Sequence, residues 1–145
     1  MNDEVKKMWL DALRSGKYKQ GSEVLHRNDP TGEERFCCLG VLCDIAVKQN
    51  VVLRATEERS DGGHNVGFAY GDEEAVTGLP KEVIKWAGFP TEIDDRETWT
   101  CFTDLGDPSL AVKDYDGVAR NRHVSFLNDS GWTFGEIALL IEEQF

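Results

Sequence analysis

The feature that most constrains this chain is its longest near-continuous apolar run, which extends from Arg35 to Val47 and holds three of the four cysteines. A run of about thirteen residues is long for a strand and ordinary for a helix. Apolar residues fall on every face of such a helix, so other elements must surround it. The sequence therefore predicts one buried central helix over residues 36–48. A buried strand followed by a short helix is the alternative.

Gly40 lies inside this predicted helix. A glycine in a helix interior costs roughly 1 kcal/mol relative to alanine, and it usually permits the close approach of a neighbouring backbone. We therefore expect another segment to pack tightly against the helix there. The stretch Thr31-Gly-Glu-Glu34 has the form of a capping box, which predicts that the helix can begin a turn earlier.

The chain has 145 residues and a formal net charge of -11, with a pI near 4.6. This length suits one domain, residues 1–145. The charge argues against direct binding to nucleic acid or to an anionic membrane. It suits a protein that presents an acidic face to a basic partner, and residues 72–116 are rich in acids. Such a face can mimic a phosphate backbone and occupy a basic site on a nucleic-acid enzyme, or it can simply be a solvated surface.

The location and thiol state follow from two further observations. No run approaches the ~20 apolar residues of a membrane span, and the acidic N-terminus does not resemble a signal peptide. We therefore expect a cytoplasmic protein with no membrane contact. Cys37, Cys38 and Cys43 share one predicted helix and cannot pair with one another, so buried free thiols are expected, with Cys101 as the remaining candidate partner.

Three further helices are expected outside the central run. The first begins at Asn2 or Asp3, carries one apolar stripe and ends at Gly16. Leu79–Gly88 has proline at its first turn and glycine at its end. The last begins with the capping box Thr133-Phe-Gly-Glu136 and runs to the end of the chain. Residues 118–127 are weakly helical.

The remaining segments predict a few short strands. They are expected at Val24-Leu25, at Val51–Leu53, at Val66–Tyr70, and in a hairpin that joins Trp99–Phe102 to Leu110–Val112. Residues 60–78 hold five glycines and are expected to form a mobile segment, because so long a loop is usually functional or disordered. The predicted fold class is α+β, helix-dominated, with a buried central helix, terminal amphipathic helices and a small antiparallel sheet.

Four motifs together resemble a family of small uncharacterised proteins of bacteriophages and prophages. They are Trp9-x-x-Ala12-Leu13-Arg14-Ser15-Gly16-x-Tyr18-x-Gln20, Phe36-Cys-Cys-Leu-Gly-Val-Leu-Cys-Asp44, Leu79-Pro-x-Glu-Val83-x-x-Trp86-Ala-Gly88 and Leu127-Asn-Asp-Ser-Gly131-x-x-Phe134-x-Glu136-Ile-Ala138. The resemblance implies no activity. It implies a setting, an acidic accessory protein in the cytoplasm of an infected host, where blocking host defences or sequestering signalling nucleotides are common tasks.

A ligand site is predicted from polar and basic residues near both ends of the chain. Arginine binds phosphate bidentately, and tyrosine stacks on bases. If the two ends meet, they form a pocket for a phosphate-containing small molecule. The candidate residues are Arg14, Tyr18, Gln20, Arg120, Arg122, Asn128 and Asp129. Alternatively, Arg14 only neutralises its own helix end, Tyr18 packs at the edge of the core, and Asn128 and Asp129 form only a turn.

The first hypothesis is therefore a non-enzymatic binding protein that needs no metal or cofactor. One alternative is a cysteine hydrolase, because Cys37, His123 and Asn128 follow the chain order of papain-like enzymes. In that mechanism the thiolate attacks a carbonyl, histidine is the base and asparagine orients it. The other reading of Cys37 is a packed core residue. A third hypothesis is a structural protein that forms homo-oligomers through a strand edge within residues 99–112.

Overall fold

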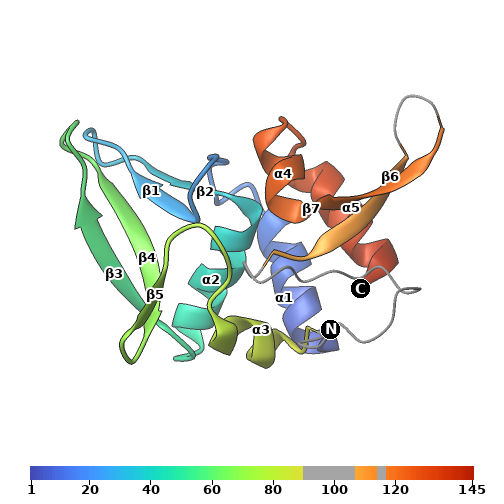
Figure 1. Ribbon diagram of the computed structural model, residues 1–145, viewed down its shortest axis with the longest axis horizontal. Coiled ribbons are helices and arrows are strands. Elements are labelled where there is room, and N and C mark those ends of the chain that lie inside the picture. The colour runs from blue at the N-terminus through green and yellow to red at the C-terminus, as the bar shows by residue number, and fades with distance from the viewer. Residues whose placement is uncertain (90–106, 114–116) are drawn as a thin grey trace.

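The computed structural model describes residues 1–89, 107–113 and 117–145. Figure 1 shows a twisted sheet on one side, helix α2 in the middle, and helices α1, α4 and α5 with a small hairpin on the other side. The helices are α1 (Asp3–Arg14), α2 (Cys38–Lys48), α3 (Lys81–Ala87), α4 (Val124–Asp129) and α5 (Phe134–Gln144). The strands are β1 (His26–Asn28), β2 (Glu34–Phe36), β3 (Leu53–Glu58), β4 (His64–Tyr70), β5 (Glu73–Ala75), β6 (Ser109–Lys113) and β7 (Ala119–His123).

Helix α2 is the centre of the core, as its sequence predicts. Residues 38–46 are all buried, and the helix packs against α1, α3, α4 and β2. Trp9 of α1 is fully buried, and its indole Nε1 donates a hydrogen bond to the Cys38 carbonyl at 2.9 Å. The cysteines at 37, 38 and 43 are free and buried, as predicted, whereas Cys101 lies outside the described residues.

The predicted start of this helix is wrong by two residues. Glu34–Phe36 forms β2, Cys37 is the N-cap, and α2 begins at Cys38, so the alternative of a strand followed by a helix holds for this end. Phe36 is held in extended form because it pairs with His26 of β1 and exchanges backbone hydrogen bonds with residues 19 and 21. The predicted capping box at Thr31 is also wrong, because residues 29–32 form the turn between β1 and β2.

The close approach expected at Gly40 is present. A Cβ atom added there would lie 1.6 Å from the backbone oxygen of Leu25. The same carbonyl accepts a hydrogen bond from the Cys37 amide at 3.1 Å. The segment that leads into β1 therefore runs directly across the first turn of α2, and only glycine leaves room for it.

The main sheet has the strand order β2-β1-β4-β3, with β5 also paired to β4, and all these pairs are antiparallel. The predicted strand at Val66–Tyr70 is confirmed within β4. However, residues 60–78 do not form a long loop, because β4 and β5 occupy much of this segment. Val66 and Phe68 alternate onto the core face and are buried, which ties the glycine-rich segment to the core.

The fold is mixed α+β, but it is not helix-dominated. Of the described residues, 38% are helical and 26% lie in strands. Sequence reasoning undercounted strands because β1, β2 and β5 have three residues each, too few for a period of two to show. The strands predicted at residues 24–25 and 51–53 begin later, at His26 and Leu53.

The terminal helices and α3 follow their sequence signals. Asn2 caps α1 by accepting from the Glu4 and Val5 amides, and Thr133 with Glu136 forms the predicted capping box of α5. Helix α3 ends at Gly88 in the left-handed conformation, with φ of 67°. The helix predicted for residues 118–127 is instead β7 followed by α4, because β7 pairs with β6. Trp99–Phe102 and Asp114–Asp116 lie outside the described residues.

Strand β6 has one further contact on the side away from β7. The Ala111 amide donates to Oε1 of Gln144 at 2.7 Å, and Nε2 of Gln144 donates to the Ala111 carbonyl at 2.9 Å. The end of α5 is thereby joined to the outer edge of β6 (Figure 1). Of the helices in the part of the chain that the structure describes, none has the length and apolar character needed to cross a membrane.

Substitution of Gly40 tests the packing of Leu25 on α2. Gly40→Ala is expected to lower the free energy of unfolding by about 3 kcal/mol, because the new methyl group overlaps the backbone of Leu25. Gly135→Ala is the matched control, since the nearest atom to a Cβ there is 3.9 Å away. That control is expected to gain about 0.5 kcal/mol from helix propensity. Urea unfolding of the two variants checks this, and equal effects would contradict it.

Candidate functional site

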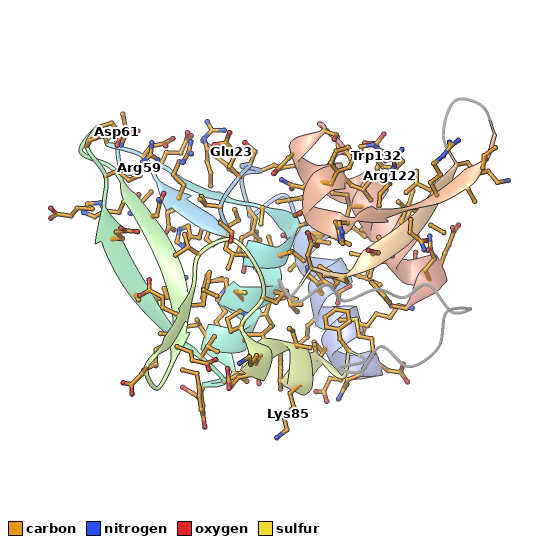
Figure 2. All side chains as sticks on the ribbon, in the orientation of Figure 1. Glu23, Arg59, Asp61, Lys85, Arg122 and Trp132 are labelled. Carbon is orange, nitrogen blue, oxygen red and sulfur yellow. The ribbon has the colours of Figure 1, made fainter. Side chains whose placement is uncertain are left out.

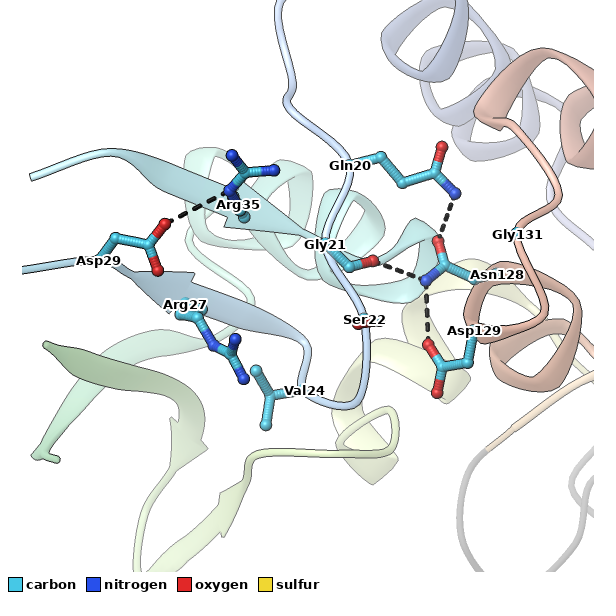
Figure 3. Close-up of a pocket in the computed structure, with 10 residues that line it drawn as sticks. All are labelled: Gln20, Gly21, Ser22, Val24, Arg27, Asp29, Arg35, Asn128, Asp129 and Gly131. Atoms are coloured by element: carbon cyan, nitrogen blue, oxygen red, sulfur yellow. Dashed lines mark hydrogen bonds and ion pairs between the residues drawn. The ribbon is translucent and has the colours of Figure 1, made fainter. Parts of the chain in front are cut away.

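A polar hollow that brings together several predicted ligand residues lies between the sheet and the end of α4. We call it the Arg27 pocket. It has a volume of about 480 Å³, and the residues that line it are Gln20, Gly21, Ser22, Val24, Arg27, Asp29, Arg35, Asn128, Asp129 and Gly131 (Figure 3). Segments distant in sequence therefore meet here: the loop after α1, the hairpin and the α4–α5 connection.

Three of the seven predicted ligand residues, Gln20, Asn128 and Asp129, come together in this pocket. Asn128 is only 3% exposed, and both ends of its amide are used. Its Nδ2 donates to the Gly21 carbonyl at 2.7 Å and to Asp129 Oδ1 at 3.1 Å. Its Oδ1 accepts from the Cys38 amide at 3.2 Å and from Gln20 at 3.1 Å. Asn128 is therefore a joint that holds the loop, α2 and α4 together.

Gln20 is bonded in the same manner. Its Nε2 also donates to the Trp132 carbonyl at 2.6 Å, and its Oε1 accepts from the Phe134 amide at 3.1 Å. The side chain thereby satisfies one of the backbone groups at the start of α5. Gln20 and Asn128 thus build the wall of the pocket, and their amides have little capacity left for a ligand.

The cations of the pocket are Arg27 and Arg35, which were not among the predicted ligand residues. They are directly opposite each other in the β1–β2 register, so both side chains lie on the same face of the sheet. Arg35 is engaged, since its Nε donates to Asp29 at 3.3 Å and its Nη2 to Glu33 at 2.7 Å. Arg35 therefore contributes charge more than free donors.

Arg27 keeps donor capacity. Its Nε is buried and has no hydrogen-bond partner among the described residues. Its Nη2 lies 3.7 Å from Oε2 of Glu23, which is longer than a charge-assisted hydrogen bond of about 2.7–2.9 Å. Figure 3 shows the guanidinium of Arg27 beside Val24 and Asp129 on the opposite wall, with the loop of residues 20–24 between them.

Two carboxylates line the pocket: Asp29, which accepts from Arg35, and Asp129 on the opposite wall. Asp129 Oδ1 accepts from the Glu23 amide and from Asn128, each at 3.1 Å. The carboxylate is at the exposed end of α4. The pocket therefore pairs a cation that has spare donors with a carboxylate that can accept from hydroxyl or amine groups.

Tyr18 lies in a second hollow, also of about 480 Å³, on the other side of β2. Its hydroxyl donates to Oδ2 of the buried Asp44 at 2.7 Å and accepts from Lys48 at 2.9 Å. Its ring packs edge-on against Phe36, with centroids 5.1 Å apart. Tyr18 thus packs at the edge of the core, which was the alternative interpretation of this residue.

Asp44 is the electrostatic centre of this second hollow. Burial alone would raise the pKa of its carboxyl group, but hydrogen bonds from Lys48, Tyr18 and Arg54 outweigh burial and hold that pKa below its ordinary value. The carboxylate is 2.8 Å from Lys48 Nζ. Asp44 is therefore ionised at neutral pH and ties α2 to the loop after α1 and to β3.

The other predicted arginines lie away from the Arg27 pocket. Arg14 forms an ion pair with Glu142 at 2.6 Å, which joins α1 to α5. Arg120 and Arg122 are on β7, and the guanidinium of Arg122 is 5.6 Å from the ring centre of Phe126. Segments near the two ends of the chain meet through Gln20, Asn128 and Asp129, which was the condition for a shared pocket, but these three arginines do not line it.

The candidate catalytic residues Cys37, His123 and Asn128 each have a separate structural role. The thiol of Cys37 is buried and accepts from the Gly40 amide at 3.4 Å, and burial raises its pKa to about 12. The Cys37 thiol is therefore protonated at neutral pH and is not activated for nucleophilic attack. His123 Nδ1 lies 3.1 Å from Ser109 Oγ, and the Asn128 amide bonds to Gly21, Cys38, Gln20 and Asp129. Among the described residues, no group of three or more His, Cys, Asp or Glu side chains is placed to hold a metal.

Comparison with known proteins gives one match. The family described as a domain of unknown function, DUF8296, matches residues 1–145. No curated protein and no solved structure matches the chain. The site must therefore be interpreted from its own geometry.

Substitution of Asn128 tests its role as a joint. Asn128→Ala is expected to lower the free energy of unfolding by about 3 kcal/mol, because it leaves the buried Cys38 amide and Gly21 carbonyl without partners. The helix cap Asn2→Ala provides the comparison and is expected to cost about 1 kcal/mol. Chemical unfolding measures both. A loss at Asn128 no greater than that at Asn2 would argue against the joint.

The Asp44 network predicts a pH dependence. A lowered pKa in the folded state means that the carboxylate adds stability above pH 4, and that this stability is lost as the pH falls through the folded pKa. Asp44→Asn is expected to cost about 2 kcal/mol at pH 7. The difference between wild type and variant should shrink steadily as the pH falls below 4. Urea unfolding across this range measures it, and a constant difference would exclude Asp44 as the source.

Proposed function

The chain belongs to the family of the domain of unknown function DUF8296, and from its site we propose that it is a non-enzymatic binding protein that captures a small phosphate-bearing ligand, a nucleotide, in the Arg27 pocket. The observation that carries this proposal is the buried Nε of Arg27, which has no partner among the described residues. A buried donor without a partner costs free energy in the unliganded protein, and a ligand acceptor would remove that cost.

The chemistry of the pocket favours a ligand with an anion at one end and donors at the other. A guanidinium matches a phosphate oxygen pair in geometry and charge. Arg35 lies directly across β1–β2 from Arg27 and adds to the positive potential. Asp129 on the opposite wall suits a sugar hydroxyl or an exocyclic amine, as carboxylates do in dinucleotide-binding folds. A nucleotide carries both kinds of group.

The lining supports capture rather than turnover. Among the described residues of the pocket, Ser22 provides the one side-chain hydroxyl, and neither histidine nor cysteine lines it. Nucleophilic catalysis needs such a hydroxyl or thiol to be paired with a base. The Cys37 hydrolase has no observation in its favour, because the Cys37 thiol is buried with a raised pKa.

We further propose a setting for this binding. The motifs of the chain resemble those of bacteriophage accessory proteins, which work in the cytoplasm of the infected host. Sequestering a host signalling nucleotide would suit a protein whose pocket binds the nucleotide without catalysing a reaction on it. Binding of a basic host protein to the acidic residues 72–116 stays a prediction. Part of that stretch lies outside the described residues.

Isothermal titration calorimetry with nucleoside mono-, di- and triphosphates and cyclic nucleotides tests the proposal. Wild type is expected to bind at least one of them, and Arg27→Gln is expected to weaken that binding by at least about tenfold, which corresponds to one charge-assisted hydrogen bond. Arg122→Gln is the matched control, because it makes the same change on β7 outside the pocket, and its affinity should equal that of wild type. Equal losses in the two variants would place the site elsewhere.

A further inference from the structure

The loop that closes the Arg27 pocket contains an unusual backbone conformation at Glu23. Its φ is +70°, a left-handed value that non-glycine residues rarely adopt. The Val24 amide donates to the Ser22 carbonyl at 2.8 Å, so Ser22, Glu23 and Val24 form a three-residue turn centred on Glu23. A γ-turn with positive φ is rare and strained. Strain of this kind persists only where neighbouring groups impose it.

The end of α4 imposes this conformation. Asp129 accepts the Glu23 amide at 3.1 Å, and Asn128 donates to the Gly21 carbonyl at 2.7 Å. These two bonds fix the backbone on either side of Ser22. The strained turn is therefore a property of the folded pocket and depends on two of its lining residues.

The turn directs the side chain of Glu23 toward Arg27. The distance from Glu23 Oε2 to Arg27 Nη2 is 3.7 Å, and the Glu23 side chain is 77% exposed whereas that of Arg27 is 30% exposed. Figure 2 shows Glu23 at the surface, on the rim between the sheet and the helices. A carboxylate thus lies at the outer side of the guanidinium and leaves the buried Nε unused.

Resting on the proposed binding of phosphate at Arg27, we infer that Glu23 is a tethered anion that competes with ligands for Arg27 and thereby limits the affinity of the pocket for phosphate. A tethered group acts at a high effective concentration. Every ligand that takes the position of this carboxylate beside Nη2 must displace it, so the apparent affinity of each such ligand is lowered by the same factor.

Binding then moves Glu23 away from Arg27. The carboxylate returns to solvent and the phosphate takes its place beside Nη2, while the Glu23 amide stays bonded to Asp129. Glu23 is in this sense a residue that sets the affinity of the pocket.

The experiment titrates wild type, Glu23→Gln and Glu23→Gly with adenosine 5′-monophosphate and with 3′,5′-cyclic adenosine monophosphate at pH 7.5. In Glu23→Gln both nucleotides should bind about tenfold more tightly than in wild type, because the competing charge beside Arg27 is removed. Glu23→Gly should show the same gain in affinity and a higher melting temperature, because glycine adopts positive φ without strain.

Glu143→Gln serves as the control, since Glu143 is exposed on α5 and does not line the pocket. Its affinities should match those of wild type. If wild type and both Glu23 variants bind neither adenosine nucleotide nor inorganic phosphate, phosphate binding at the pocket fails and the inference fails with it. If wild type binds and Arg27→Gln weakens binding, but Glu23→Gln keeps the wild-type affinities for both nucleotides, the pocket stands and the competing role of Glu23 is overturned.

Discussion

The contact between the Leu25 backbone and Gly40 is the constraint on which the rest of the structure depends. Because α2 has no side chain at this position, the chain passes across its first turn instead of around it, and the Leu25 carbonyl accepts the Cys37 amide. The Leu25 amide in turn donates to the Val76 carbonyl at 2.8 Å. One residue thereby connects the N-terminus of the buried helix to the segment after β5. The loop of residues 20–24, which forms one wall of the pocket, enters β1 through this contact.

Asn128 adds side-chain hydrogen bonds to that backbone contact. A buried amide group must satisfy both its donors and its acceptor, because the interior offers no water to take their place. Asn128 meets this requirement by bonding three segments that are far apart in sequence. The consequence is a rigid wall on one side of the pocket, while Arg27 and Asp129 on its rim remain available. Asn128 thus contributes to the stability of the site, whereas Arg27 and Asp129 are the residues that can contact a ligand.

Local signals made the ends of the fold predictable. The caps at Asn2 and Thr133 and the glycine at residue 88 act through nearby backbone groups, so the sequence alone places α1, α3 and α5. The start of α2 was misplaced because Phe36 is held by strand pairing with residues that are distant in sequence. The alternation at Val66–Tyr70 correctly predicted β4, but the glycine content of residues 60–78 wrongly predicted a long loop around it.

The site was predictable to a smaller extent. Gln20, Asn128 and Asp129 were found because they are polar residues outside the apolar stripes of their motifs. Arg27 and Arg35 become neighbours only through the hairpin register, which a turn at residues 29–32 sets. Reading that turn as a hairpin instead of a helix cap would have paired them, since the residues flanking a short turn face each other.

The contact between Gln144 and Ala111 has a consequence for how copies of this protein meet. The amide of Gln144 presents one donor and one acceptor to β6, as the backbone of an adjoining strand would. At Ala111 the end of α5 thus makes the hydrogen bonds that a neighbouring strand would make to β6. Another chain could pair with β6 at Ala111 only by displacing the Gln144 side chain. The two hydrogen bonds between Gln144 and Ala111 would then be lost. The backbone groups of Ala111, which an additional strand would use for pairing, are thus already bonded within the same chain.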